Sequence, residues 1–153
     1  MNTIFEWLSE YQKFHNNSIN KIIHWICVPL IIISLFGLLS LIKFETPFMK
    51  LTIVDIFIFL VILYYLRLSI SLSIGMLVFS FLSIFLINNI NNNFSILNLA
   101  FIYVAIFILS WIGQFIGHKI EGKKPAFIKD IQFLLIGPLW LLSFIYKKFN
   151  IKL

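Results

Sequence analysis

Three histidines are the residues of this sequence best suited to bind a metal ion, and they fall into two polar clusters. His15 and His24 precede the first long apolar stretch, whereas His118 follows a later one. A lone histidine near a membrane interface is more often a hydrated or hydrogen-bonded residue than a metal ligand, but three that coincide with polar helical stripes favour a metal site. If an even number of helices separates the clusters, the three imidazoles lie on one face of a membrane and can converge on a metal.

The residues around His24 place other polar side chains beside it. At about 100° per residue, the start of the first apolar helix carries a polar stripe within an arc of about 100°, formed by Asn17, Asn20, Lys21 and His24. His15 follows Tyr11 by one helical turn, and the break at Asn16 and Asn17 lets His15 fold back toward His24. Asparagine is also a common N-cap, so part of this stripe could serve only to begin a helix.

A second polar stripe lies where the last unambiguous apolar stretch ends. Spacings of three, four and three residues put its members within an arc of about 80° on a helix: Trp111, Gln114, His118 and Glu121. His118 and Glu121 can bind one ion together, or Glu121 can act as the hydrogen-bonding partner of a ligating His118. An ordinary salt bridge between Glu121 and Lys119 or Lys124 is the alternative.

The composition is that of a polytopic membrane protein. Of the 153 residues, 61% are hydrophobic and 12% are charged, and the mean hydropathy is +1.00, whereas about a quarter of residues are charged in soluble domains. This length allows four or five spans of about 20 residues, with almost nothing left for an extramembrane domain. We therefore expect a single membrane-embedded helical domain over residues 1–153.

The apolar pattern predicts an all-α integral membrane protein with about four transmembrane helices. A short amphipathic helix within Met1 to Asn16 is expected to lie at the membrane interface. The predicted spans run from about Ile19 to Ile42, Leu51 to Leu66, Leu68 to Ile87 and Ile96 to Ile116, with polar loops at Lys43 to Pro47 and Asn88 to Asn93. The last apolar segment, Ile131 to Tyr146, is short and contains Gly137-Pro138, so it could be a kinked span, a re-entrant hairpin or an interfacial helix. A span would place the C-terminal lysines outside, which favours a re-entrant or interfacial segment.

The net charge of +6 is distributed in a way that predicts a lipid bilayer, and no nucleic acid, as partner. Basic residues gather beside the apolar segments, where anionic headgroups would lie. With the N-terminus inside, the inner segments carry most of them, and the first outer loop carries only Lys43 and Lys50. The predicted location is the inner membrane of a bacterium, or the endoplasmic reticulum of a eukaryote, with the histidines facing the cytoplasm.

Two blocks of the sequence resemble the signature blocks of a known family. The blocks are Tyr11-x3-His15-x-Asn17-x2-Asn20-x3-His24, followed by Val28-Pro29, and Trp111-x2-Gln114-Phe115-x-Gly117-His118-x2-Glu121-x3-Pro125-Ala126. They are similar to those of the small membrane proteins related to the fungal 2-hydroxy fatty acid dioxygenase. The similarity extends over nearly the whole chain.

This resemblance implies an iron(II)-dependent dioxygenase of fatty acid alpha-oxidation. Such an enzyme converts a long-chain 2-hydroxy fatty acid and O2 into a fatty acid one carbon shorter, with loss of CO2. Imidazoles, with or without a carboxylate, suit non-haem iron(II) and leave positions open for oxygen and substrate. The expected metal ligands are His15, His24, His118 and Glu121; the expected catalytic residues are Glu121, Gln114 and Asn20; the expected substrate-binding residues are Lys21, Lys119, Lys123, Asn17 and Tyr11.

Two other functional classes remain open from the sequence. The chain could be a b-type haem protein in which His24 and His118 are the axial ligands. It could also be a non-catalytic membrane protein whose polar stripes only begin and end helices.

Overall fold

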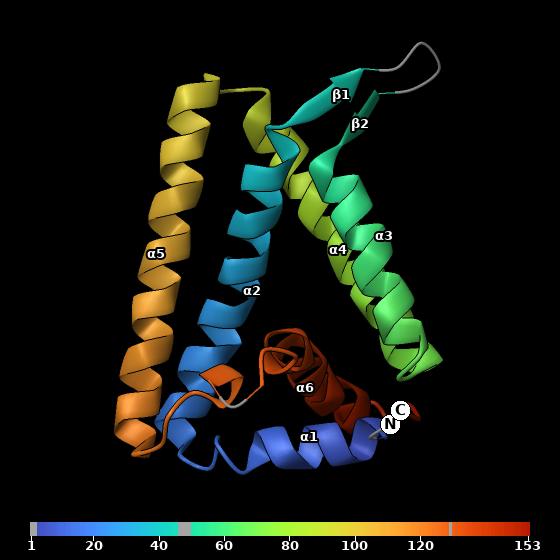
Figure 1. Cartoon of the computed structure of the whole chain (residues 1–153), viewed down its shortest axis with the longest axis vertical. Helices are drawn as coiled ribbons and strands as arrows, with labels where there is room; N and C mark the ends of the chain where they lie inside the picture. The colour runs from blue at the N-terminus through green and yellow to red at the C-terminus, as the bar shows by residue number, and fades with distance from the viewer. Residues whose placement is uncertain (1–2, 46–49, 129) are drawn as a thin grey trace.

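The predicted all-helical fold is confirmed. The computed structural model describes residues 3–45, 50–128 and 130–153. Within these ranges the chain forms, in order, α1 (Ile4–Gln12), α2 (Ser18–Ser40), β1 (Lys43–Glu45), β2 (Lys50–Thr52), α3 (Ile53–Leu66), α4 (Ile70–Asn91), α5 (Ile96–Glu121), the short 3-10 helix η1 (Ala126–Ile128) and α6 (Phe133–Lys148) (Figure 1).

Helices α2, α3, α4 and α5 run between the two ends of the molecule, with α3 and α4 tilted away from α2 and α5, and the chain reverses between each and the next (Figure 1). Helices α1 and α6 lie together across one end of this bundle, where α2 begins, α3 turns into α4 and α5 ends. We call this the polar end, and the opposite end, with the β1–β2 hairpin and the α4–α5 connection, the outer end. Four helices therefore separate the two histidine clusters, which meet at the polar end as predicted.

Three of the helices, α2, α4 and α5, are long and apolar enough to cross a membrane. The prediction of about four such helices is not confirmed, because α3 has only 14 residues and so spans about 21 Å. The hydrocarbon core of a bilayer is about 30 Å thick. The predicted second span was too long at its start, because Leu51 and Thr52 belong to β2 and the helix begins at Ile53.

Two predicted loops differ from the structure. In place of a plain loop after α2, Lys43–Glu45 pairs antiparallel with Lys50–Thr52; Pro47 lies outside the described residues. The predicted asparagine-rich loop is largely helical, since α4 continues to Asn91. Asn89 Nδ2 donates to the carbonyl four residues earlier at 3.0 Å, so this side-chain amide finds a partner within the helix.

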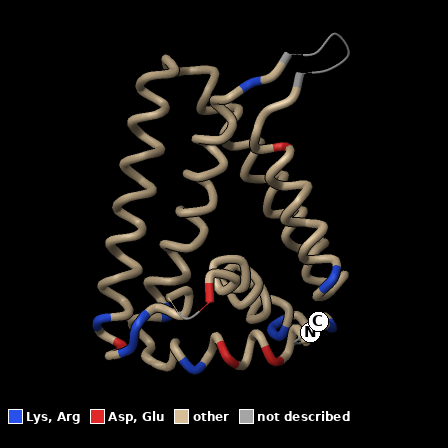
Figure 2. Tube along the Cα trace, in the orientation of Figure 1, with Lys and Arg blue, Asp and Glu red and all other residues tan. Residues whose placement is uncertain are grey.

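The surface of the bundle is apolar along its length and charged near its ends. Figure 2 shows most Lys, Arg, Asp and Glu residues gathered at the polar end, with few at the outer end. Large apolar side chains between the ends are exposed, for example Phe81 at 71%, Phe101 at 77% and Leu109 at 66%. Contiguous exposed apolar surface of this kind is stable against hydrocarbon rather than water.

The last apolar segment forms one continuous helix, α6, so the predicted re-entrant form is not confirmed. Its buried residues Phe133, Ile136 and Trp140 form a core with Trp7 and Tyr11 of α1. This core lies across the polar end of the bundle, and its Tyr11 and Trp140 rings pack against His15. The fold therefore encloses His15, which follows α1, between α1, α2, α5 and α6.

Candidate metal centre

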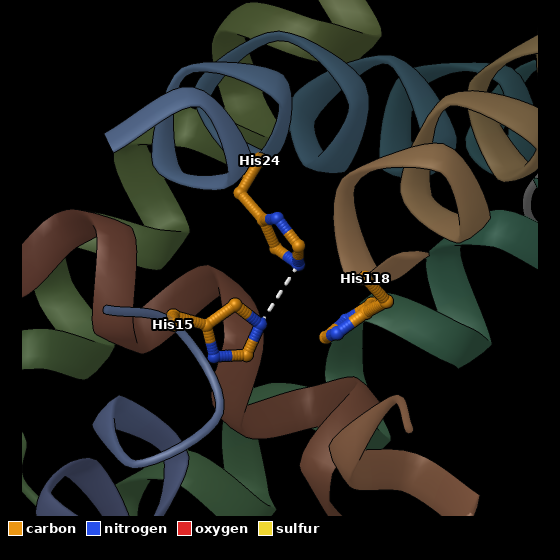
Figure 3. Close-up of side chains that lie close together, drawn as sticks. All are labelled: His15, His24 and His118. Atoms are coloured by element: carbon orange, nitrogen blue, oxygen red, sulfur yellow. Dashed lines mark hydrogen bonds between the residues drawn. The ribbon is translucent and has the colours of Figure 1, made fainter. Parts of the chain in front are cut away.

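The three histidines meet at one point (Figure 3). His15 lies in the connection between α1 and α2, His24 in the second turn of α2 and His118 in the last turn of α5. One ring nitrogen from each lies within 4.8 Å of the others, and the three residues are only 0%, 1% and 5% exposed. The predicted convergence is confirmed, and the group could hold a metal ion.

The hydrogen bonds of His15 and His24 fix which nitrogen carries the proton. His15 Nδ1 donates to the Tyr11 carbonyl at 2.7 Å, and His24 Nδ1 donates to the Asn20 carbonyl at 2.9 Å. Because a carbonyl oxygen can only accept, each neutral ring has its proton on Nδ1 and its lone pair on Nε2. The same arrangement orients metal-binding histidines in other proteins.

The two Nε2 atoms face each other at 2.9 Å, and two lone pairs at this distance repel unless they share a cation. A proton is a poor candidate, because burial and the neighbouring His24 lower the pKa of His15 to about 3. Two imidazole nitrogens that bind one ion at about 2.0–2.1 Å lie about 3 Å apart when they subtend a right angle. The pair therefore fits a metal ion.

His118 supplies the third nitrogen, and a buried nitrogen of its ring is a further argument for a metal ion. Its Nδ1 atom is buried and has no hydrogen-bond partner among the described residues. A buried polar atom without a partner costs stability, and coordination would satisfy the ring. Three neutral imidazoles converging on one point form a donor set that fits a divalent transition metal.

Glu121 lies beside this group but uses both oxygens elsewhere. Its Oε1 accepts from the Asn16 main-chain N–H at 2.8 Å, and its Oε2 accepts from the Asn17 N–H at 2.8 Å and from Asn20 Nδ2 at 3.1 Å. The carboxylate thus ties the end of α5 to the loop that carries His15. The prediction that Glu121 binds the metal directly gains no support from this geometry.

Asn20 and Gln114 approach the histidines from α2 and α5. Both are buried. Asn20 Oδ1 and Gln114 Nε2 have no hydrogen-bond partner among the described residues. Gln114 lies one turn before His118, as the spacing predicted, and its free amide therefore gives the site an unused hydrogen-bond donor.

The predicted substrate-binding residues divide into two groups. Tyr11 is buried and stacks on His15, with ring centroids 4.2 Å apart, and burial raises the pKa of its hydroxyl. Asn17 caps α2, since its Oδ1 accepts from the Ile19 N–H at 2.8 Å. The three lysines lie at the polar end, where α2 begins and α5 ends. Lys119 and Lys123 are exposed and Lys21 is half-buried. Lys123 Nζ donates to the Lys13 carbonyl at 2.6 Å.

An apolar cavity of about 450 Å³ opens from the histidines into the bundle. His24, His118, Gln114 and Tyr11 lie in the wall at one end. The rest of the wall is almost entirely apolar, with contributions from α2, α3, α4, α5, the segment between α5 and α6, and the start of α6. The volume lies within the range of about 300–1,000 Å³ that is usual for small-molecule sites. None of Lys21, Lys119 and Lys123 lines it.

Two glycines of α5, neither of them predicted as a site residue, bring His118 close to His24. Gly113 faces Cys27 Sγ and Gly117 faces the Asn20 amide, so a Cβ at either position would collide with α2. The Gly-x3-Gly spacing is a known signal for close helix packing in membranes. It was visible in the sequence and predicts the tight contact between α2 and α5.

A tryptophan and a glutamine, also not predicted as site residues, hold His15 from the other side. Gln12 Nε2 donates to the His15 carbonyl at 2.8 Å, and Gln12 Oε1 accepts from Trp140 Nε1 at 3.0 Å. The Trp140 ring packs 5.1 Å from the His15 ring and 6.3 Å from the His24 ring, centroid to centroid. The sequence separates Trp140 from Gln12 by 128 positions, so no local pattern indicates this contact.

The haem alternative does not suit the observed positions. Axial ligands must lie on opposite sides of a porphyrin plane. The rings of His24 and His118 have centroids 5.1 Å apart, and the His15 ring lies 4.3 Å from the first and 5.0 Å from the second. Three rings packed this closely leave no space for a macrocycle between two of them.

Comparison with known proteins agrees with this geometry. A family model described as "2-hydroxy-palmitic acid dioxygenase Mpo1-like" matches residues 1–149. Curated proteins and solved structures give no match. Since the family model covers nearly the whole chain, including all three histidines, the protein belongs to the Mpo1-like family.

Proposed function

We propose that this protein is an iron(II)-dependent dioxygenase that shortens long-chain 2-hydroxy fatty acids by one carbon. The observation that carries the proposal is the position of three neutral imidazoles at one end of an apolar cavity of about 450 Å³. A reactive head group beside the histidines and an acyl chain in the cavity would satisfy both features. The description of the family supports the same class of substrate.

The stoichiometry suits so small a protein. The reaction R–CH(OH)–COOH + O2 → R–COOH + CO2 + H2O balances in atoms, and the substrate supplies all the electrons that O2 accepts. No separate reductase site is required. Bound by His15, His24 and His118, iron(II) would supply a centre that chelates the 2-hydroxycarboxylate and binds O2.

The residues around the histidines have distinct roles in this proposal. Gln114 Nε2, which lacks a hydrogen-bond partner in the described part of the chain, donates to the substrate head group. Tyr11 and Trp140 pack against His15 and exclude water from the reacting atoms. Asn20 and Glu121 are positioning residues, because they join α2, α5 and the His15 loop.

We assign the lysines a role outside the cavity. Lys21, Lys119 and Lys123 lie at the polar end, where a fatty acid carboxylate enters from the headgroup region, and they attract it electrostatically. Their effect should therefore be on substrate capture rather than on the chemical step.

We also propose the orientation in the membrane. The polar end, which carries most of the basic residues, faces the cytoplasm, in a bacterial inner membrane or in the endoplasmic reticulum. Helix α3 crosses with the other three, because it lies along them and the β1–β2 hairpin continues it beyond its own length. In a Cys27→Ala background, a cysteine replacing Lys13 should react from the cytoplasmic side and one replacing Ser95 from the opposite side.

The test of the proposed reaction uses protein reconstituted with iron(II) and supplied with O2. The 2-hydroxy acid of 16 carbons should be consumed with O2 uptake and CO2 release, and the matching acid without the hydroxyl should be inert, because it lacks the second chelating oxygen. Equal reactivity of the two acids would overturn the proposal. So would inactivity of both in a sample shown to contain iron.

A further inference from the structure

The cavity has a defined depth along the bundle axis. On α2 its wall extends from His24 to Phe36, and on α5 from His118 to Phe107. At about 1.5 Å per residue, these segments are about 18 Å and 16 Å long. The cavity thus extends more than halfway from the histidines toward the outer end.

Two phenylalanines stand at its far end. Phe36 of α2 and Phe57 of α3 both line the cavity, and their rings meet edge to face with centroids 6.2 Å apart. Phe36 is only 4% exposed. Phe36 belongs to a second hydrophobic cluster that fills the outer end of the bundle, and Phe57 packs against it. We call this the outer cluster: Phe36, Val54, Ile87, Leu99 and Tyr103.

The outer cluster is held in place by a hydrogen-bonded chain behind Phe36. The Tyr103 hydroxyl donates to Asn91 Oδ1 at 2.8 Å, and Asn91 Nδ2 donates to Ser40 Oγ at 3.2 Å. The Tyr103 ring lies against Gly37, where an added Cβ would come within 2.5 Å of the ring. Because α2, α4 and α5 are all joined here, the support behind Phe36 cannot withdraw easily.

We propose that Phe36 and Phe57 form an end stop that sets the longest acyl chain the cavity accepts. This inference rests on the proposed function for the identity of the ligand. A carbon–carbon bond of about 1.5 Å at a near-tetrahedral angle advances an extended chain by about 1.25 Å. A depth of about 16–18 Å therefore holds roughly 13 or 14 carbons beyond the head group.

Variants with opposite effects test the end stop. Phe57→Ala and Phe36→Leu enlarge the far end, and Phe36→Leu keeps the buried site apolar in case a larger truncation prevents folding. Ile32→Trp fills the cavity about two-thirds of the way from His24 to Phe36. Phe59→Ala is the matched control, because Phe59 lies on α3 but is 62% exposed.

Two measurements follow the same chain-length series, from about 12 to about 20 carbons. The first is kcat/KM for 2-hydroxy acids. The second is equilibrium binding of the plain acids to the purified holoprotein, by displacement of a brominated fatty acid that quenches Trp111, a residue of the cavity wall. Affinity should rise about fourfold for each added methylene until the chain reaches the stop, and then fall.

Phe57→Ala and Phe36→Leu should move this break point to chains roughly two carbons longer, Ile32→Trp should move it to shorter chains, and Phe59→Ala should leave it unchanged. An unchanged break point in both enlarging variants, with the proteins folded, would overturn the end stop. Binding that breaks as expected while no 2-hydroxy acid is consumed would instead overturn the proposed reaction and leave the end stop standing.

Discussion

Replacing Glu121 with glutamine separates its positioning role from that of a metal ligand. The carboxylate accepts three hydrogen bonds: two from the main chain of the His15 loop and one from Asn20. Glutamine keeps only one acceptor oxygen, so its amide group must face one of the two main-chain N–H groups. The loop that carries His15 should then be held less firmly, although no histidine is altered.

The size of the effect follows from these bonds. A hydrogen bond to a charged group contributes about 1.5–3 kcal/mol, and the half-buried position of Glu121 reduces this through solvent screening. Losing one hydrogen bond and weakening another should weaken the free energy of metal binding by about 2 kcal/mol, which is roughly a 30-fold loss of metal affinity. Changes around metal-binding histidines typically cost about 10- to 100-fold.

Competition with a chromogenic chelator measures this affinity in detergent. Asp55→Asn is the control, since Asp55 also accepts two hydrogen bonds at a helix start, but at the outer end, and should leave metal affinity unchanged. Glu121→Asp keeps the charge and should recover part of the loss. A change below about threefold for Glu121→Gln would refute the positioning role, whereas a loss beyond about 1,000-fold would show that the carboxylate binds the metal itself.

Other contacts give further predictions. Gly113→Ala should lower metal affinity and thermal stability because its Cβ would lie 2.6 Å from Cys27 Sγ, and adding Cys27→Ala should restore both. Trp140→Phe removes the bond to Gln12 and should reduce metal affinity several-fold with little change in helix content by circular dichroism. Lys123→Ala should raise KM severalfold at low salt and change kcat by less than about twofold, because an exposed lysine that attracts the substrate carboxylate contributes under about 1 kcal/mol. A loss confined to kcat would contradict this role.

The sequence was sufficient to predict how the histidines converge. The even number of helices and the break at Asn16 and Asn17 together bring His15, His24 and His118 to one end of the bundle. These features depend on hydropathy and local capping, which are strong signals in a membrane protein.

The role of Glu121 could not be predicted, because it depends on donors that the spacing does not show. The helical pattern places Glu121 beside His118, but its partners are main-chain N–H groups of Asn16 and Asn17, more than 100 positions away. Helix starts leave N–H groups unpaired, yet nothing local indicates which carboxylate will reach them. The contacts of Gln12 with His15 and with Trp140 could not be predicted either, because Trp140 is also far away in the sequence.

The predicted helix boundaries were wrong in segments whose composition does not indicate their secondary structure. The run from Asn88 to Asn93 is polar, yet α4 continues to Asn91 because asparagine side chains bond within the helix and Asn91 meets Tyr103. The start of α3 was placed too early because apolar Leu51 suits a strand as well as a span.

The number of iron ions bound per chain, measured by elemental analysis of protein purified without chelators, tests the central claim most directly. The wild-type protein should bind about one iron ion per chain, and His15→Ala, His24→Ala and His118→Ala should each bind far less while remaining inserted and helical, because each removes one of three ligands. Full iron content in any one of these variants would contradict a centre built from all three imidazoles.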